Sequence, residues 1–205
     1  MRRRLLLLGL AALAGTRRAA AQAPYRAVKP GEVLRGRFTQ ERRIKGFDRP
    51  LLSSGAFVLA PGLGLIWRTE RPFAIDTVIT AAGLVQEVGG TETTRLTAAR
   101  LPFLGRLYDL LGGALSGDWH VLGSQFEMTQ HGDASHWDLT LVPRAGADPL
   151  AMPFRSITLR GGQFLDEVSI ARLDDDSDRL VFSDQTVGVG GLSEAEAARL
   201  REAGK

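Results

Sequence analysis

Cysteine is absent from the 205 residues of the sequence. This absence excludes disulfide frameworks, thiol nucleophiles, cysteine-based zinc sites and iron–sulfur clusters held by thiolates. Long apolar runs are also lacking, because the run at residues 5–15 covers 11 residues, whereas a membrane-spanning helix needs about 20. A chain of this length suits one domain whose core needs no cross-links.

The N-terminus has the pattern of an export signal. Arginines at positions 2–4 precede the apolar run 5–15, and residues 19–21 are all alanine, the small side chain that a signal peptidase reads. We predict a cleaved signal peptide at residues 1–21, a single domain at residues 22–205 and a periplasmic location. The arginine pair leaves the general and the twin-arginine export routes both open.

Removal of this segment changes the sign of the net charge. The whole chain has a formal charge of +3, but five of its 26 basic residues lie in residues 1–21, which hold no acidic residue. The exported chain therefore carries 21 basic against 23 acidic residues. Such a surface argues against a nucleic-acid partner, because binding to phosphates requires a basic footprint.

Alternation of apolar and polar residues predicts a mainly β fold. Runs rich in Val, Ile, Phe, Thr and Trp are separated by Gly, Pro or Asp turns, and Trp137, Leu139 and Leu141 alternate with polar neighbours. Helical crossovers are missing between consecutive runs, so we expect antiparallel strands with one buried face. The predicted strands are 33–45, 53–60, 63–69, 73–80, 83–88, 91–96, 123–131, 135–143, 154–161, 164–171 and 179–185.

Two segments have helical spacing instead. Residues 101–115 carry an apolar stripe, and glycines in this segment, each costing about 1 kcal/mol relative to alanine, leave the helix easy to move. Ser193 and Glu196 form a capping-box pattern at the start of a second helix, 193–203. The stripe consists of Leu104, Leu107, Tyr108, Leu111 and Leu115. We predict an unclosed antiparallel β-barrel, a half-barrel of about 10–11 strands, with this first helix as a lid on its concave face.

Catalytic and metal-binding patterns are weak. His131 and His136 flank a turn, and the acidic run 174–178 lacks the glycine and glutamate of a helix–loop–helix calcium site. The sequence has no nucleophile elbow and no phosphate-binding glycine loop. We therefore expect no metal, no cofactor and no catalysis. An exported hydrolase that uses Asp76 or Asp166 is the least favoured alternative.

Apolar residues of the predicted strands are the strongest remaining signal. Core packing alone explains any single one of them. Export, an open barrel and a glycine-rich helix together favour a cavity for an apolar ligand. A register shift of one residue would exchange the predicted lining residues with neighbours such as Ile66 or Val78. We predict that the cavity is lined by Phe38, Phe57, Leu65, Trp67, Phe73, Ile75, Trp137 and Leu139.

Several motifs resemble those of the periplasmic outer-membrane lipoprotein carriers, the LolA-like family. Residues 34–40, Leu-Arg-Gly-Arg-Phe-Thr-Gln, resemble the first strand of these carriers, which ends in Phe-Thr-Gln. Residues 54–57 (Ser-Gly-Ala-Phe), 61–67 (Pro-Gly-Leu-Gly-Leu-Ile-Trp) and 137–143 (Trp-Asp-Leu-Thr-Leu-Val-Pro) resemble later strands in the same order. The resemblance extends from about residue 33 to residue 185.

This resemblance implies a carrier that shields the acyl chains of a lipoprotein or another lipid and moves them towards the outer membrane. It also implies an inner-membrane donor and an outer-membrane acceptor as partners, and we expect a monomer. Ala60 stands where the carriers have an arginine that tethers the lid, so the chain is expected to be a divergent member. An envelope interaction or sensor module that uses the same half-barrel remains the main alternative.

Overall fold

Strands dominate the part of the chain that the structure describes. This computed structural model describes residues 26–98, 113, 115, 123, 126–133, 135–146, 153–188 and 190–204. The strands are β1 (Val33–Arg43), β2 (Leu51–Ala60), β3 (Gly64–Arg71), β4 (Ile75–Thr80), β5 (Gly83–Val88), β6 (Thr91–Thr97), β7 (Phe126–Gly132), β8 (Trp137–Pro143), β9 (Phe154–Gly161), β10 (Leu165–Arg172) and β11 (Ser177–Gly188), and the helix α3 (Glu194–Ala203) follows them. Within these ranges, no helix has both the length and the apolar character needed to span a membrane.

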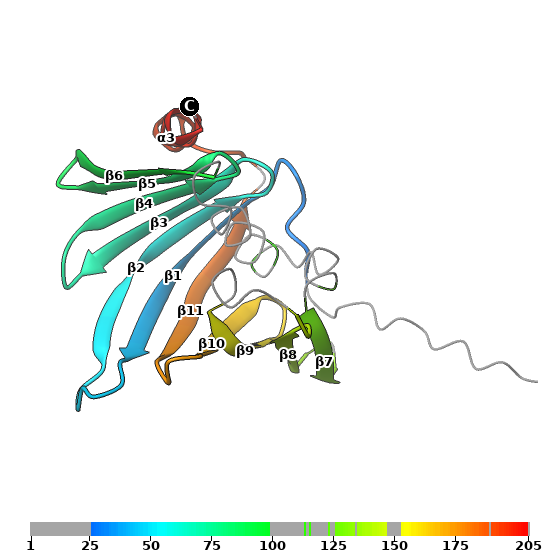
Figure 1. Cartoon of the computed structure of the whole chain (residues 1–205). Helices are drawn as coiled ribbons and strands as arrows, with labels where there is room; N and C mark the ends of the chain where they lie inside the picture. The colour runs from blue at the N-terminus through cyan, green and yellow to red at the C-terminus, as the bar shows by residue number, and fades with distance from the viewer. Residues whose placement is uncertain are drawn as a thin grey trace, which may run out of the picture.

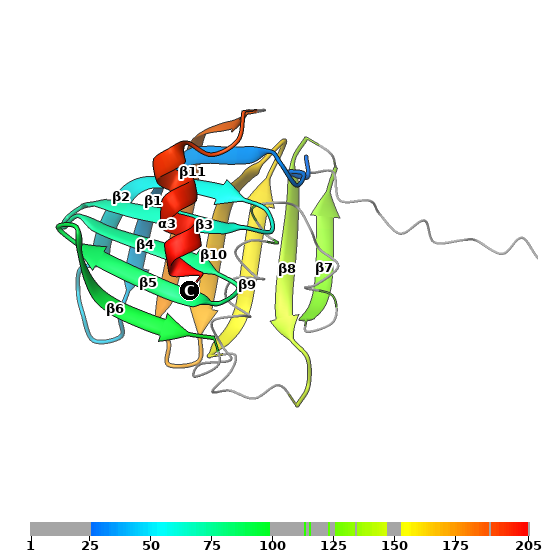
Figure 2. The same ribbon diagram turned by 90° about the horizontal axis from the view of Figure 1, so that it is seen from above.

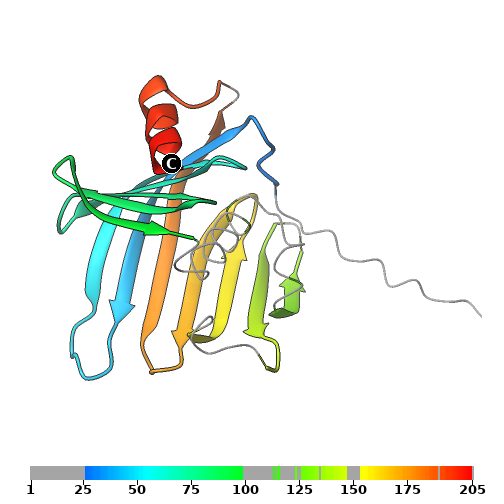
Figure 3. The ribbon, with the colours of Figure 1, turned by 45° about the horizontal axis from the view of Figure 1, so that its top comes forward.

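All the strands belong to one antiparallel sheet (Figure 1). Its order is β6-β5-β4-β3-β2-β1-β11-β10-β9-β8-β7, so strands that follow one another are neighbours, and the first strand also pairs with the last. This arrangement places β6 and β7 at opposite edges of the 11-stranded sheet. Figure 3 shows that the sheet curls without closing. The predicted half-barrel of antiparallel strands is confirmed.

Side chains alternate between the inner and outer faces of the curled sheet. On β1, Leu34 and Phe38 lie in the inner core, whereas Val33 lies in the outer core. The inner core draws residues from both halves of the sheet, and the outer core gathers where α3 lies across β3, β4 and β5 (Figure 2). The outer core consists of Val33, Ala60, Ile66, Val78, Val85, Leu200 and Ala203.

The helix α3 is fixed to the outer face by its cap, by packing and by ion pairs. The Ser193 hydroxyl accepts a hydrogen bond from the Glu196 N–H at 3.2 Å, and a Glu196 carboxylate oxygen accepts one from the Ser193 N–H at 2.7 Å. A Cβ on Gly64 would lie 2.6 Å from a methyl group of Leu200, so glycine permits this close approach. Arg199 forms ion pairs of 2.9 Å with Asp76 on β4 and 2.5 Å with Glu87 on β5.

The strand positions agree with the sequence prediction apart from a few ends. β4 begins at Ile75 rather than at 73, because residues 72–74 form the turn after β3. β11 extends over Ser177–Gly188, beyond the predicted 179–185, because it pairs with β1 along its length. The predicted C-terminal helix and its capping box are confirmed as α3. The predicted signal peptide, residues 1–21, lies outside the described residues.

We expect truncation of the main apolar contact of α3 to loosen the helix from the sheet. Leu200 is 6% exposed, so Leu200→Ala should lower the free energy of unfolding by about 2 kcal/mol, as measured by urea titration. The control is Leu63→Ala at a side chain that is 60% exposed, which should leave stability nearly unchanged. Equal stability of the two variants would contradict the packing described for α3.

Candidate functional site

Four aromatic rings from β1, β2, β3 and β11 form the centre of the inner face. Phe38 stacks on Trp67 with ring centroids 3.8 Å apart, and Phe57 meets Phe182 edge to face at 5.5 Å. The strand register pairs Phe57 with Trp67 and Phe38 with Phe182. Gly36 leaves room for this group, because a Cβ there would lie 2.7 Å from the Phe57 ring. The result is a large apolar surface with defined ring geometry.

The other half of the inner face, from β7 to β10, is aliphatic with an aromatic border. Apolar side chains lie next to each other on neighbouring strands of this half, since Leu139 pairs with Leu159 and Leu141 with Ile157. Near the β9–β10 turn, the Trp137 indole N–H donates a hydrogen bond of 2.8 Å to the Gly162 carbonyl, which fixes the ring against this half of the sheet. The two halves together form one apolar inner core that extends across the curled sheet.

The structure places most of the predicted lining residues together. Phe38, Phe57, Leu65, Trp67, Trp137 and Leu139 lie in or against the inner core. Ile75 is half-buried on β4 and, because side chains alternate, shares the face of Ile79, an inner-core residue. Phe73 lies apart from them, 71% exposed in the turn between β3 and β4. Contact between any of these residues and a ligand remains a prediction.

The predicted face of each strand agrees with the two cores, and the predicted lid is described only in part. Ile66 and Val78, which a shift of one residue would turn inward, lie in the outer core. Ala60 is also there, packed with residues of α3. Leu115 is helical, 1% exposed and part of the inner core. The other predicted lid residues, Leu104, Leu107, Tyr108 and Leu111, lie outside the described residues.

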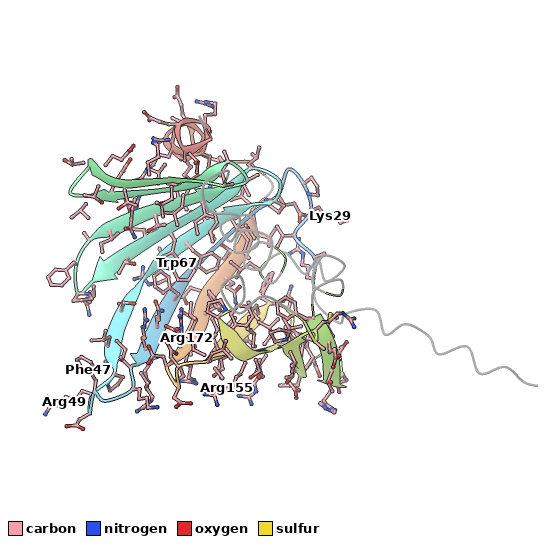
Figure 4. The ribbon with its side chains drawn as sticks, viewed as in Figure 1. Lys29, Phe47, Arg49, Trp67, Arg155 and Arg172 are labelled. Carbon is pink, nitrogen blue, oxygen red and sulfur yellow. The ribbon has the colours of Figure 1, made fainter. Side chains whose placement is uncertain are left out.

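Five polar residues interrupt the apolar inner face near the β1–β2 and β10–β11 turns. We call this group the polar corner: Gln40, Arg42, Ser53, Arg172 and Asp178. Asp178, 6% exposed, accepts hydrogen bonds from the Gln40 amide at 2.9 Å and from the Arg172 Nε at 3.2 Å. The Ser53 hydroxyl donates a hydrogen bond of 3.3 Å to the side-chain amide oxygen, Oε1, of Gln40. Figure 4 shows Arg172 on the same side of the sheet as Trp67, nearer to the strand ends.

The arginines of the polar corner keep hydrogen-bond donors in reserve. The Nε of Arg42 is buried and has no hydrogen-bond partner among the residues that the structure describes. Its guanidinium reaches Asp176 at 3.6 Å, beyond hydrogen-bond distance. Arg172 contacts Asp178 through Nε, and within the described part of the chain its terminal N–H groups make no hydrogen bond. These two arginines make this end of the inner face cationic and rich in hydrogen-bond donors.

Sequence reasoning missed the polar corner, although alternation along β1 contained a signal for it. Positions 34 and 38 on the inner face of β1 are apolar, but the next two inward positions are Gln40 and Arg42. A strand whose inward series changes from apolar to polar indicates where an apolar wall ends. The contribution of Asp178 required knowledge of the β1–β11 register, which pairs it with Arg42.

The carboxylates considered for catalysis do not meet. Asp76 lies on β4 and pairs with Arg68 at 2.9 Å and with Arg199 at 2.9 Å. Asp166 lies on β10, separated from β4 by β3, β2, β1 and β11, and burial raises its pKa. Among the described residues, no group of three or more His, Asp or Glu side chains is arranged to hold a metal ion.

The chain matches the family model described as "Outer membrane lipoprotein carrier protein LolA-like" over residues 12–199. Among curated protein sequences, none is significantly similar to this chain. The family match covers all the strands and most of α3, and so includes both the inner face and the polar corner.

Solved structures resemble the chain only at low sequence identity. A chain of the Pseudomonas aeruginosa MucA/MucB complex has 14% identity and a TM-score of 0.46, over 81% of this chain and 55% of that one, so the present chain spans about half its length. A LolA superfamily protein from Nitrosomonas europaea has 7% identity and a TM-score of 0.42, over 82% and 90% of the two chains. The Mycobacterium tuberculosis lipoprotein LppX has 10% identity and a TM-score of 0.36, over 76% and 86%.

Loss of the carboxylate at the centre of the polar corner should destabilise the sheet. Asp178→Ala would leave Gln40 and Arg172 without their shared acceptor, and we expect the free energy of unfolding to fall by about 2 to 3 kcal/mol in urea titrations. Asp48→Ala is the matched control, because Asp48 is exposed and forms no ion pair with the described residues. A similar loss in both variants would contradict the network.

Proposed function

Because the chain belongs to the LolA-like family of outer membrane lipoprotein carrier proteins, we propose that it carries acyl chains of a lipoprotein or another lipid across the periplasm, towards the outer membrane. The observation that carries this proposal is the continuous apolar inner face of an open half-barrel, together with the family match over residues 12–199. No cofactor and no covalent step is part of the proposed function.

Binding of an acyl chain would replace water at the inner face with apolar contacts. Each buried methylene contributes about 0.8 kcal/mol, so full burial of a chain of about 16 carbons would contribute on the order of 12 kcal/mol. A carrier with that affinity would not release its cargo at a useful rate. The function therefore requires a competing occupant that lowers the net affinity.

We propose that the lid supplies this competition. Leu115 already occupies the inner core, 1% exposed, and it is the last residue of the predicted lid stripe. An entering acyl chain would have to displace apolar side chains of the lid, and the free energy of that displacement would be subtracted from the affinity of the cargo. The glycines of the segment weaken the helix and would therefore keep the free energy of this displacement small.

The polar corner would set the orientation of the cargo. An amphiphile with its acyl chains against the aromatic centre and the β7–β10 wall would have its polar end next to Arg42 and Arg172, whose unused N–H groups are hydrogen-bond donors. Burial of that polar end elsewhere on the apolar face would leave it without partners, at a cost of several kcal/mol. One orientation would therefore be preferred.

Export would bring the chain to its place of action. The predicted signal peptide, residues 1–21, would direct it to the periplasm, where a donor at the inner membrane would load it and an acceptor at the outer membrane would unload it. We propose that the carrier acts as a monomer.

Co-purification tests the proposed function directly. Native mass spectrometry of the protein purified from the cell envelope should detect bound acyl lipid or a lipoprotein. A protein free of lipid, purified with a protein partner on the same face, would overturn the carrier function in favour of an interaction module. Hydrolysis of esters or glycosides, lost on changing Asp76 or Asp166, would overturn it in favour of an enzyme.

The lid assignment has its own test. Leu107→Glu would place a charge in the apolar stripe, so we expect loss of binding to a fluorescent fatty acid, while the β-type circular dichroism spectrum stays unchanged. Leu63→Glu, at a side chain that is 60% exposed on the β2–β3 turn, is the matched control and should bind as the unaltered chain does. Unchanged binding in the Leu107 variant would refute the lid assignment.

A further inference from the structure

Exposed apolar side chains gather at one end of the half-barrel. The β1–β2, β3–β4 and β5–β6 turns lie at this end because the strands are antiparallel, and the β10–β11 turn joins them because Arg43 pairs with Ser177. Six of the nine large hydrophobic residues that are exposed in the described chain occur at these turns. They are Phe47, Leu51, Leu52, Phe73, Val88 and Leu173, and we call this set the apolar rim.

Three side chains of the apolar rim are about two-thirds exposed or more. Phe47 is 69% exposed, Leu52 65% and Phe73 71%. Single exposed apolar residues are ordinary on soluble proteins, whereas several large ones on neighbouring turns at one end of a sheet favour an interaction surface. The turns at the opposite end of the sheet differ from the rim. Among their described residues, the exposed large hydrophobic side chain is that of Leu63, at the β2–β3 turn.

Basic side chains accompany the rim. Arg49 follows Phe47 by two residues and Arg71 precedes Phe73 by two, both are exposed, and neither forms an ion pair with the part of the chain that the structure describes. Residues 41–52 contain four basic and two acidic residues. Figure 4 shows Phe47 and Arg49 at the tip of the β1–β2 hairpin, pointing away from the sheet.

We propose that the apolar rim docks the protein onto an anionic lipid bilayer. Phe47 and Leu52 would enter the boundary between headgroups and acyl chains, while Arg49 and Arg71 would contact lipid phosphates, the arrangement that holds peripheral proteins at membranes. The rim consists of separate turn tips, which suits a flat bilayer. An open hollow of about 320 Å³ between β1, β2, β3 and β11 is lined by Leu52 and Arg71, and also by Glu41 and Arg179.

This inference rests on the proposed function, because a carrier that works between two membranes has its donor and its acceptor at membrane surfaces, where a docking surface would hold it. The polar corner lies directly behind the rim, because Arg42 is the last residue but one of β1 and Arg172 is the last residue of β10, next to Leu173. A cargo headgroup bound there would already lie near the bilayer surface. The rim and the polar corner thus belong to the same end of the half-barrel.

Co-sedimentation with vesicles tests the apolar part of the rim. The protein, purified after expression of the full chain, is mixed with vesicles of phosphatidylcholine or of an equimolar mixture with phosphatidylglycerol. The double variant Phe47→Ser and Leu52→Ser should bind about tenfold more weakly. Leu63→Ser, at an equally exposed side chain, should bind as the unaltered chain does. Equal binding of both variants, or no binding by the unaltered chain, would overturn the proposal.

Charge reversal tests the electrostatic part. Arg49→Glu should weaken binding about tenfold on the vesicles that contain phosphatidylglycerol and hardly at all on phosphatidylcholine. Arg201→Glu, an exposed residue of α3 on the outer face, is the control and should bind both vesicles unchanged. An effect of equal size in both variants would mean that net charge acts instead of the rim, and would overturn the proposal.

Fatty-acid binding separates failure of this inference from failure of the proposed function. The rim variants should bind a fluorescent fatty acid in solution as tightly as the unaltered chain, whereas Leu107→Glu should lose fatty-acid binding and keep vesicle binding. Rim-dependent vesicle binding without fatty-acid binding would overturn the carrier function alone. Fatty-acid binding with vesicle binding that ignores the rim would overturn the docking surface alone.

Discussion

The pairing of β1 with β11 is the interaction on which the rest of the structure depends. Its ladder runs from Val33 opposite Gly188 to Arg43 opposite Ser177, and it joins the strands β2 to β6 and the strands β7 to β10 into one sheet. Two separate sheets would each expose an apolar face to water. The same ladder sets Phe38 beside Phe182 and Arg42 beside Asp178, so the aromatic centre and the polar corner have a common origin.

Apolar surface is buried in different ways on the two faces of the sheet. On the outer face, α3 covers a small patch and is held by a capping box, by a close approach over Gly64 and by Arg199 between two carboxylates. Each of these contacts requires a particular partner, so α3 is suited to remain packed on the outer face. The inner face is larger and curved, and its aromatic and aliphatic residues require only that their partner be apolar. In the proposed function, a requirement this general would allow side chains of the protein and an acyl chain to compete for one surface.

The sequence predicts local features of this protein better than long-range ones. Alternation in segments such as 137–141 is enough to predict the strands and the face of most lining residues, and Ser193 with Glu196 is enough to predict α3. The polar corner depends on β11 lying beside β1, a contact between residues more than a hundred positions apart that no local pattern contains. Phe73 fits the alternation of apolar and polar residues in β4, but it belongs to the turn at 72–74, and β4 begins only at Ile75. The exposure of a residue at a strand end is therefore harder to predict than that of one in the middle.

The two ends of the half-barrel differ in chemistry, and this difference would give the proposed transfer a direction. At one end, Trp137 is hydrogen-bonded to the Gly162 carbonyl and the wall is apolar up to the turn. At the other end, the inner face becomes polar at Gln40 and Arg42, and the turns beyond carry exposed apolar side chains. An amphiphile bound as proposed would gain apolar contacts at the first end and polar contacts at the second, so its polar end would face the turns. Its acyl chains would then leave past the polar corner, and a bilayer at the turns would receive them without exposure to water, which is the step that costs most in free solution.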